Sequence, residues 1–162
     1  MAGRADTAAE KRAEPAKERE FPDIVMSMTA MKRVLQEDAT GCGLACVAMV
    51  AGKTYPEVRK LTLEYLGFDP DGPFYTTLED LRYLLDWYGY KVLRWTPFKT
   101  YESPSPISIL EVKRTGLHTH WVLLVKCGLD MYVLDPSMNV KTERRRDWHR
   151  LRPISYANII KA

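Results

Sequence analysis

The sequence has no run approaching the roughly 18 consecutive apolar residues that a membrane-spanning helix needs. Its N-terminus also lacks the apolar core of a secretory signal peptide, because residues 1–20 are charged and alanine-rich throughout. Cysteine is scarce, and three cysteines cannot all pair within one chain, so a disulfide framework is not expected. These absences predict a cytoplasmic protein in a reducing compartment.

Neither sign of charge dominates the chain. The 24 Lys and Arg residues and 21 Asp and Glu residues leave a net charge of +3, too small to indicate a nucleic-acid partner. Hydrophobic residues make up 46% and charged residues 28%, which excludes collagen-like, wholly disordered and disulfide-scaffold proteins. A length of 162 residues fits a single domain with a real core.

The first 20 residues differ from the rest of the chain. They contain six alanines, five basic and five acidic residues, and no large apolar residue after Met1. Such a segment buries too little apolar surface to offset the entropy lost on ordering. The sequence therefore predicts a disordered charged tail over residues 1–20 and a folded domain over residues 21–162.

Helix signals occupy the first half of the domain. An apolar, alanine-containing run bounded by glycines at 41–52 predicts a buried helix with Cys42 at its start. A threonine followed three residues later by glutamate predicts a helix from residue 54 towards 67. A third helix is expected from Thr76 or Thr77 to Gly89, with leucines at helical spacing.

After Gly89 the apolar period changes to two, which is typical of strands. The expected strands are Tyr90–Trp95, Ile107–Val112, His120–Val125, Met131–Leu134 and Ile154–Ile160. Helices followed by strands predict an α+β fold.

A hairpin between the third and fourth of these strands brings two polar residues together. A turn centred between Cys127 and Gly128 places His120 opposite Asp135. A turn one residue further along still leaves both on one face of the sheet, whereas a three- or five-residue loop separates them. The predicted His–Asp contact therefore depends on the hairpin register.

Cys42 is the candidate nucleophile. At the N-terminus of a buried helix, unpaired backbone N–H groups and the positive end of the helix dipole favour a thiolate. A cysteine on an apolar helix is more often a small packed hydrophobe, and this interpretation suits Cys46. An imidazole held by a carboxylate beside Cys42 would complete a nucleophilic site.

Two further residues bear on this site. His118 competes with His120 for the catalytic role, but His120 adjoins the apolar run and faces Asp135, so it is preferred. Gln36, six residues before Cys42, can return its side-chain amide as a second oxyanion donor beside the Cys42 N–H.

The site residues stand in a longer pattern: Gln36-x5-Cys42-Gly43-x-Ala45-Cys46-x-Ala48-Met49, then His120-Trp121, then Leu134-Asp135-Pro136. This pattern resembles the C39 family of papain-like cysteine peptidases over most of residues 30 to 140. The resemblance implies an α+β, papain-like fold in which a helical N-terminal half packs on a C-terminal antiparallel sheet. It also implies roles for four residues: Cys42 as nucleophile, His120 as general base and acid, Asp135 as its orienting partner and Gln36 in the oxyanion hole.

The resemblance carries expectations about substrate and partners. Members of this family commonly cleave leader peptides after a Gly-Gly pair, without a cofactor, and many are N-terminal domains of peptide-exporting ABC transporters. Here neither membrane helices nor a phosphate-binding loop follows, so a free-standing domain with a separate transporter partner is expected. The residue before the cysteine, usually Asp in the family, is Gly41.

Two other functions are compatible with these residues. The same groove suits a non-catalytic peptide-binding module. Alternatively, Cys42, Cys46, His118 and His120 are four ligand types that suit a small structural zinc site.

Other residues receive structural interpretations. The arginines of the basic segment 141–152, together with His149, are interpreted as a solvated face. Candidates for the groove walls are Tyr75, Trp87, Tyr88 and Trp95, although aromatics at this spacing are usually core.

Overall fold

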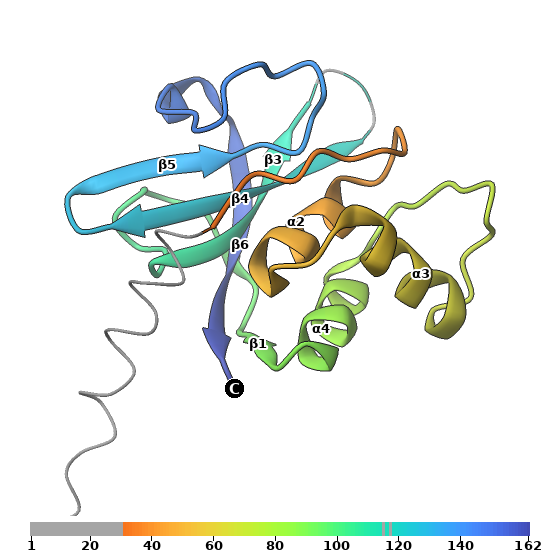
Figure 1. Ribbon diagram of the computed structural model, residues 1–162. Helices are drawn as coiled ribbons and strands as arrows, with labels where there is room; N and C mark the ends of the chain where they lie inside the picture. The colour runs from red at the N-terminus through yellow and green to blue at the C-terminus, as the bar shows by residue number, and fades with distance from the viewer. Residues whose placement is uncertain (1–30, 115, 117) are drawn as a thin grey trace, which may run out of the picture.

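The computed structural model describes residues 31–114, 116 and 118–162, and Figure 1 shows how they are arranged. The expected charged tail, residues 1–20, lies outside the described residues. The helices of the described part are α2 (Cys42–Ala51), α3 (Tyr55–Tyr65) and α4 (Leu78–Trp87), with a 3-10 turn at Trp148–Arg150. None of the helices in this part of the chain is long and apolar enough to cross a membrane.

The helix boundaries agree with the sequence signals. Thr54 and Glu57 form a reciprocal capping box at the start of α3, each side chain bonding the backbone N–H of the other. Thr77 and Asp80 do the same at the start of α4. Polar side chains thus satisfy backbone donors that the helix itself leaves unpaired. All three expected helices are confirmed.

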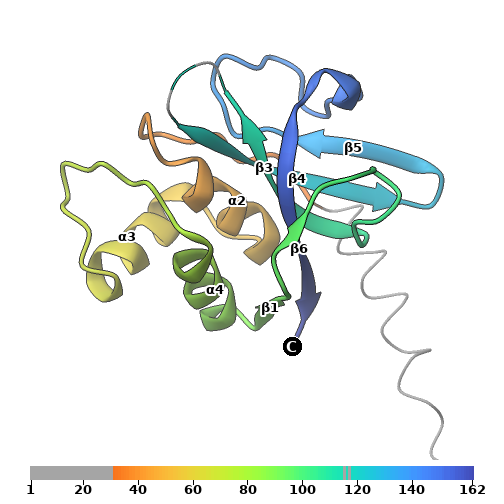
Figure 2. The same cartoon turned by 180° about the vertical axis from the view of Figure 1, so that it is seen from behind.

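The strands form one antiparallel sheet on one side of the helices. They are β1 (Tyr90–Val92), β2 (Thr96–Pro97), β3 (Ile107–Lys113), β4 (Thr119–Cys127), β5 (Asp130–Leu134) and β6 (Pro153–Lys161). The order across the sheet is β1-β6-β3-β4-β5, with β2 pairing β6. Figure 2 shows β3 and β6 crossing the back of the molecule beside each other, as their pairing requires. The α+β architecture is confirmed.

One expected strand is shorter than predicted. Of the segment predicted as Tyr90–Trp95, only Tyr90–Val92 forms a strand, β1, and the next short strand, β2, lies just beyond the predicted segment at Thr96–Pro97. The side chain of Arg82 on α4 donates to the carbonyls of Val92 and Leu93, which ties this connection to the helices. The strand pattern therefore continues along β6, but as two short pieces.

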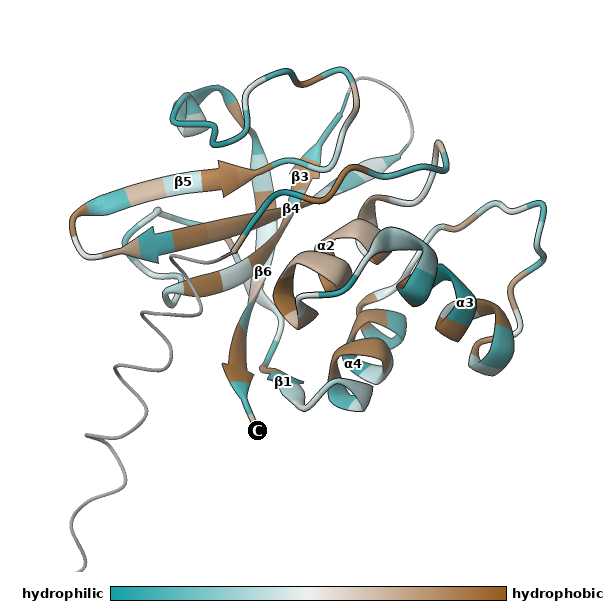
Figure 3. Ribbon diagram, in the orientation of Figure 1, coloured by the Kyte–Doolittle hydropathy of each residue, from teal (hydrophilic) through white to brown (hydrophobic). Residues whose placement is uncertain are grey.

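Helix α2 is buried on all sides, as its uniform apolar composition predicts. Every residue from Gly43 to Val50 is buried, because α2 contacts α3, α4 and β4. Strand β4 also buries both faces: alternate residues enter the core beneath the helices or a second core on the far side of the sheet. Figure 3 shows α2 and the middle of β4 in apolar colours.

The β4–β5 hairpin turns one residue later than the predicted centre. Its loop is Gly128-Leu129, so Leu124 pairs with Val133. Gly128 has φ 60°, a conformation that glycine adopts freely at the first central position of a two-residue hairpin loop. The expected pairing of His120 directly opposite Asp135 is therefore wrong. Moving the turn by one residue moves each pairing partner by two residues, and side chains two apart lie on the same face of a strand. His120 and Asp135 therefore remain on one face of the sheet, as diagonal neighbours.

Candidate active site

Cys42 is the first residue of α2, and its side chain is half-buried at the junction between α2 and β4. The residue before it, Gly41, begins the helix with no side-chain cap. The backbone N–H groups of the first turn are consequently free to act on groups near the sulfur. The Cys42 thiol receives hydrogen bonds from the backbone N–H groups of Gly43 and Trp121, and these lower its pKa.

The departure at Gly41 has a steric explanation. A Cβ at this position would collide with the hydroxyl of Tyr55, so only glycine fits. That hydroxyl donates to Asp38 Oδ2 at 2.6 Å, and Arg59 Nε donates to the same oxygen at 3.1 Å. The carboxylate that this chain uses to tie the loop before the helix to α3 is thus Asp38.

His120 and Asp135 are in direct contact. His120 Nε2 lies 2.8 Å from Asp135 Oδ1, and the two side chains are only 4% and 3% exposed. A carboxylate accepts only, so Nε2 carries the proton and the other ring nitrogen, Nδ1, is left for the thiol of Cys42. Asp135 Oδ1 also accepts from the Ser137 N–H at 3.0 Å, which fixes the carboxylate plane.

The charges of Cys42 and His120 support each other. Burial alone would raise the pKa of Cys42, but hydrogen bonding with His120 and the two backbone N–H groups outweighs it, so that the pKa is lowered. Burial alone would lower the pKa of His120, but its bonds to Asp135 and Cys42 outweigh this and raise it. A thiolate–imidazolium pair is the state that these shifts favour.

Gln36 is buried close to these residues. Its backbone N–H donates to Pro136 O at 2.9 Å, which places it beside the residue that follows Asp135. Its amide nitrogen donates to the carbonyls of Asp38 and Ala39, at 3.1 and 2.9 Å. The backbone of Gln36 therefore lies beside the segment that carries Asp135, its amide is bonded to its own loop, and its role as an oxyanion donor stays a prediction.

The zinc alternative is not supported. His118 is exposed and stacks on the ring of Tyr75, with centroids 4.5 Å apart. Cys46 is buried one turn below Cys42, and burial, followed by the nearby charges of Cys42 and Asp135, raises its pKa. Across residues 31–114, 116 and 118–162, no three His, Cys, Asp or Glu side chains gather closely enough to hold a metal ion.

Two small cavities reach Cys42, each of about 240 Å³. One extends to Thr76 and Trp121, and the other to Arg114 and His120. Both are also lined by the same four further residues: Thr40, Tyr75, His118 and Thr119. The stacked rings of Tyr75 and His118 therefore join the helical half to the sheet half at the entrance to the thiol.

The four aromatic residues expected to form the groove walls lie in different places. Tyr75 lines the cavities beside Cys42, as expected of a wall residue. Tyr88 and Trp95 instead pack against the main core, and Trp87 is exposed against the ring of Tyr65 on the outer side of α3 and α4. Of the four candidates, only Tyr75 contributes to the site.

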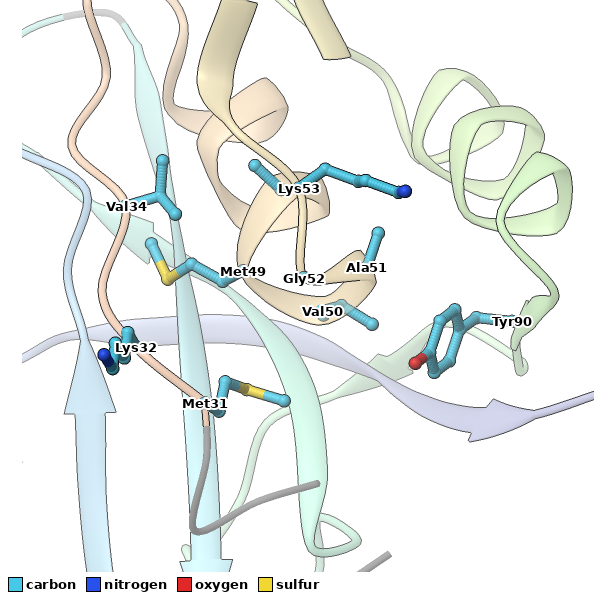
Figure 4. Close-up of a pocket in the computed structure, with 10 residues that line it drawn as sticks. Met31, Lys32, Val34, Met49, Val50, Ala51, Gly52, Lys53 and Tyr90 are labelled. Atoms are coloured by element: carbon cyan, nitrogen blue, oxygen red, sulfur yellow. The ribbon is translucent and has the colours of Figure 1, made fainter. Parts of the chain in front are cut away.

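A separate cavity of about 400 Å³ lies at the opposite end of α2 (Figure 4). It is lined by residues around Met31 and Val34, by the end of α2 at Met49, and by Tyr90 of β1. Ten residues of helix, on the order of 15 Å, separate that end from Cys42. This cavity therefore does not belong to the site around the thiol.

The sequence interpretation missed Arg145, which was placed on a solvated basic face. Its Nη1 donates to Asp135 Oδ2 at 2.8 Å, and its side chain is only 16% exposed. Neighbouring arginines are also engaged: Arg146 forms two bonds with Asp130, and Arg144 lies over the ring of Tyr132. The run of arginines in the sequence carries no signal for these partners, since each lies on another segment.

The fold is shared with two solved peptidase domains. One is a double glycine motif protease from an AMS/PCAT transporter, solved in complex with the leader peptide, with a TM-score of 0.56 and 17% identity over 82% of this chain and 94% of that chain. The other is the peptidase domain of Streptococcus ComA, a bifunctional ABC transporter of a quorum-sensing pathway, with a TM-score of 0.59 and 22% identity over 82% and 98%.

Sequence comparison adds nothing to this structural likeness, because no family model and no curated protein sequence matches the chain. At these low identities the likeness shows the fold. The helical half packed on an antiparallel sheet, as the C39 resemblance implied, is therefore confirmed.

The contact between Gly41 and Tyr55 gives a first prediction. Gly41→Ala should destabilise the domain by about 1–3 kcal/mol, because its methyl group meets the Tyr55 hydroxyl in a packed loop. Tyr55→Phe removes that oxygen, so the double variant should lose less than the sum of the two single losses. Urea unfolding of the four proteins measures the coupling energy, and additive losses would contradict the steric explanation.

The ion pair gives a second prediction, which concerns alkylation by iodoacetamide. Because the pKa of Cys42 is lowered and that of Cys46 is raised, Cys42 should react rapidly at neutral pH while Cys46 does not. The rate should fall as the pH drops through the lowered pKa of Cys42, since the thiolate is then protonated. Intact mass and peptide mapping follow the reaction, with Cys42→Ala as the control. Equal labelling of all three cysteines would contradict the ion pair.

Proposed function

We propose that this chain is a cysteine peptidase in which Cys42, His120 and Asp135 form the catalytic triad. The observation that carries the proposal is a chain of contacts: a thiol at a helix N-terminus interacts with an imidazole, which in turn bonds a buried carboxylate. The lowered pKa of Cys42 and the raised pKa of His120 favour the reactive charge state. If Cys42 and His120 had only a structural role, the fold would need neither of these two pKa shifts.

Each residue has a defined task in the proposed reaction. The Cys42 thiolate attacks the carbonyl carbon of the scissile bond, and His120 gives its proton to the leaving amine as the bond breaks. A water molecule, deprotonated by His120, then hydrolyses the thioester and restores the thiol. Asp135 keeps the imidazole in one tautomer and stabilises its charged form, without exchanging protons.

The negative oxygen of the tetrahedral intermediate needs donors next to Cys42. The backbone N–H of Cys42, at the first turn of α2, is one donor that the helix leaves free. We assign the second to the Gln36 amide, which bonds the carbonyls of Asp38 and Ala39 in the loop that leads to Cys42 and would exchange them for the oxyanion.

Substrate selection is proposed to follow from the narrow approach to Cys42. Tyr75 and His118 stack across the entrance, and the two cavities at the thiol are small, which favours residues without side chains before the scissile bond. Both similar domains come from transporters, and one is a double glycine motif protease bound to a leader peptide. We therefore propose cleavage after Gly-Gly, which removes the leader from a peptide that a partner transporter exports.

A peptide library tests this specificity. Wild-type protein should cleave after Gly-Gly, whereas peptides with alanine in place of either glycine should be cut at least about tenfold more slowly, because a methyl group contacts the narrow walls. Mass spectrometry identifies the cut, with Cys42→Ala as the control for contaminating proteases. Equal cleavage after bulky residues would remove the leader-peptide proposal. A reactive Cys42 without any cleavage would favour a binding role or another acyl transfer.

The proposed role of Asp135 gives a separate prediction. Asp135→Asn should keep the fold but reduce kcat/KM about 10- to 100-fold, because a charge-assisted hydrogen bond to the imidazolium becomes a neutral one. Asp130→Asn, the same change on the exposed end of the hairpin, is the matched control. Steady-state cleavage of the best library peptide measures both. Equal activity of the two variants would exclude Asp135 from the triad.

The choice between the two histidines is tested in the same assay. His120→Ala removes the proposed base and acid, so it should abolish detectable cleavage. His118→Ala opens the wall of the cleft, so it should alter substrate choice while cleavage continues. A more damaging effect of His118→Ala would reassign the catalytic histidine.

A further inference from the structure

Arg145 is attached to the β4–β5 hairpin, which carries His120 and leads into Asp135, two of the three residues of the candidate triad. Its backbone forms a two-bond bridge with Val133 of β5, with N–H to carbonyl distances of 2.8 and 2.9 Å. Arg145 therefore pairs with the outer edge of β5, opposite Val133, which is two residues before Asp135 in the chain. This anchorage is independent of the arginine side chain.

The guanidinium group of Arg145 joins two carboxylates. Its Nε and Nη2 bond the two oxygens of Asp147, at 3.0 and 3.1 Å, in a forked geometry. The remaining nitrogen, Nη1, donates to Asp135 Oδ2 at 2.8 Å. Asp147 thus fixes the orientation of the guanidinium group, and the Nη1 atom of that group bonds Asp135 of the proposed triad.

Asp135 is consequently held on both oxygens. Oδ1 accepts from His120 and from the Ser137 N–H, and Oδ2 accepts from Arg145. Rotating the carboxylate away from the imidazole would break the bond to the guanidinium as well. A buried carboxylate with a single partner would lack this restraint, and the free-energy cost of keeping it charged would be higher.

Other ionisable groups surround this carboxylate and its imidazole. Cys42 faces His120, and the charge of Asp135 acts on Cys46. Arg33 Nη1 approaches the backbone carbonyl of Asp135 at 3.4 Å, and Arg114 Nη2 lies 3.3 Å from His120 Nε2. Of the arginines Arg33, Arg114 and Arg145, only Arg145 bonds a carboxylate oxygen of Asp135.

We propose that Arg145 is a positioning residue of the peptidase, which acts through Asp135 to hold His120 charged and aimed at Cys42. The inference rests on the proposed function. Burial raises the pKa of Asp135, and the bonds from His120, Ser137 and Arg145 reverse that shift and lower it. Loss of the guanidinium removes one of these bonds and frees the carboxylate to turn, so the imidazolium loses its aligned partner.

A purely structural role would be to hold the loop between Asp135 and Arg145. That loop has other supports, because Arg33 donates to Val140 O at 2.6 Å and the backbone bridge to Val133 remains in any side-chain variant. The side chain of Arg145 is therefore not needed to keep the loop in place, and its effect on His120 can be measured separately.

The test compares Arg145→Met, Arg145→Lys and Arg146→Met with the wild type. Arg146 is the matched control, because it is next in the chain but bonds Asp130 on the exposed end of the hairpin. The pH profile of Cys42 alkylation by iodoacetamide is the main measurement, since it reports the thiolate–imidazolium pair without a known substrate. Thermal unfolding of each variant separates this effect from loss of fold.

In Arg145→Met the acid limb of the profile should move to higher pH, and the rate at acidic pH should fall on the order of tenfold, as expected for loss of one hydrogen bond to a charged group. Arg145→Lys keeps the charge without the fork and should be intermediate. Arg146→Met should match the wild type.

Two results would overturn this inference while leaving the triad intact: a wild-type profile in Arg145→Met, or equal losses in the Met and Lys variants with a matching fall in Tm. A wild-type Cys42 no more reactive than Cys46 would overturn both proposals together.

Discussion

The burial of α2 between the sheet and the other two helices is the constraint on which the rest of the structure depends. An apolar helix without charged residues gains stability only when every face is covered, so α3, α4 and β4 must all close around it. That packing presses the first turn of α2 against the start of β4. The thiol of Cys42 and the imidazole of His120 meet because the two elements that carry them are forced together there.

Each ionisable group in this junction contacts a group that can carry the opposite charge. In the charge state that the pKa shifts favour, the Cys42 thiolate, the His120 imidazolium, the Asp135 carboxylate and the Arg145 guanidinium alternate in sign, with each group bonded to the next. Isolated charges at these levels of burial would be costly, so each group depends on its neighbours for its ionised state. The reactivity proposed for Cys42 is therefore a property of the whole line, which ends at the exposed side of Asp147.

Local signals made much of the fold predictable. Capping residues at Thr54 and Thr77 act within one helical turn, so their effect is visible in the sequence and the helices begin where expected. The change from helical to alternating apolar spacing after Gly89 likewise predicts the sheet. The candidate residues Cys42, His120 and Asp135 could be chosen in advance for the same reason, since each stands at a recognisable end of a helix or strand.

Sequence alone therefore determined the elements, the α+β class and the residues that could react, because these depend on neighbours within a few positions. Tertiary structure alone decided the rest. The pairing of β4 with β5 decided the hairpin register, a tyrosine 14 positions away decided the need for Gly41, and a carboxylate on another segment decided the contact of Arg145 on which its proposed role rests. Such contacts join positions that the chain brings together only when it folds, and no local pattern records which partner each side chain will meet.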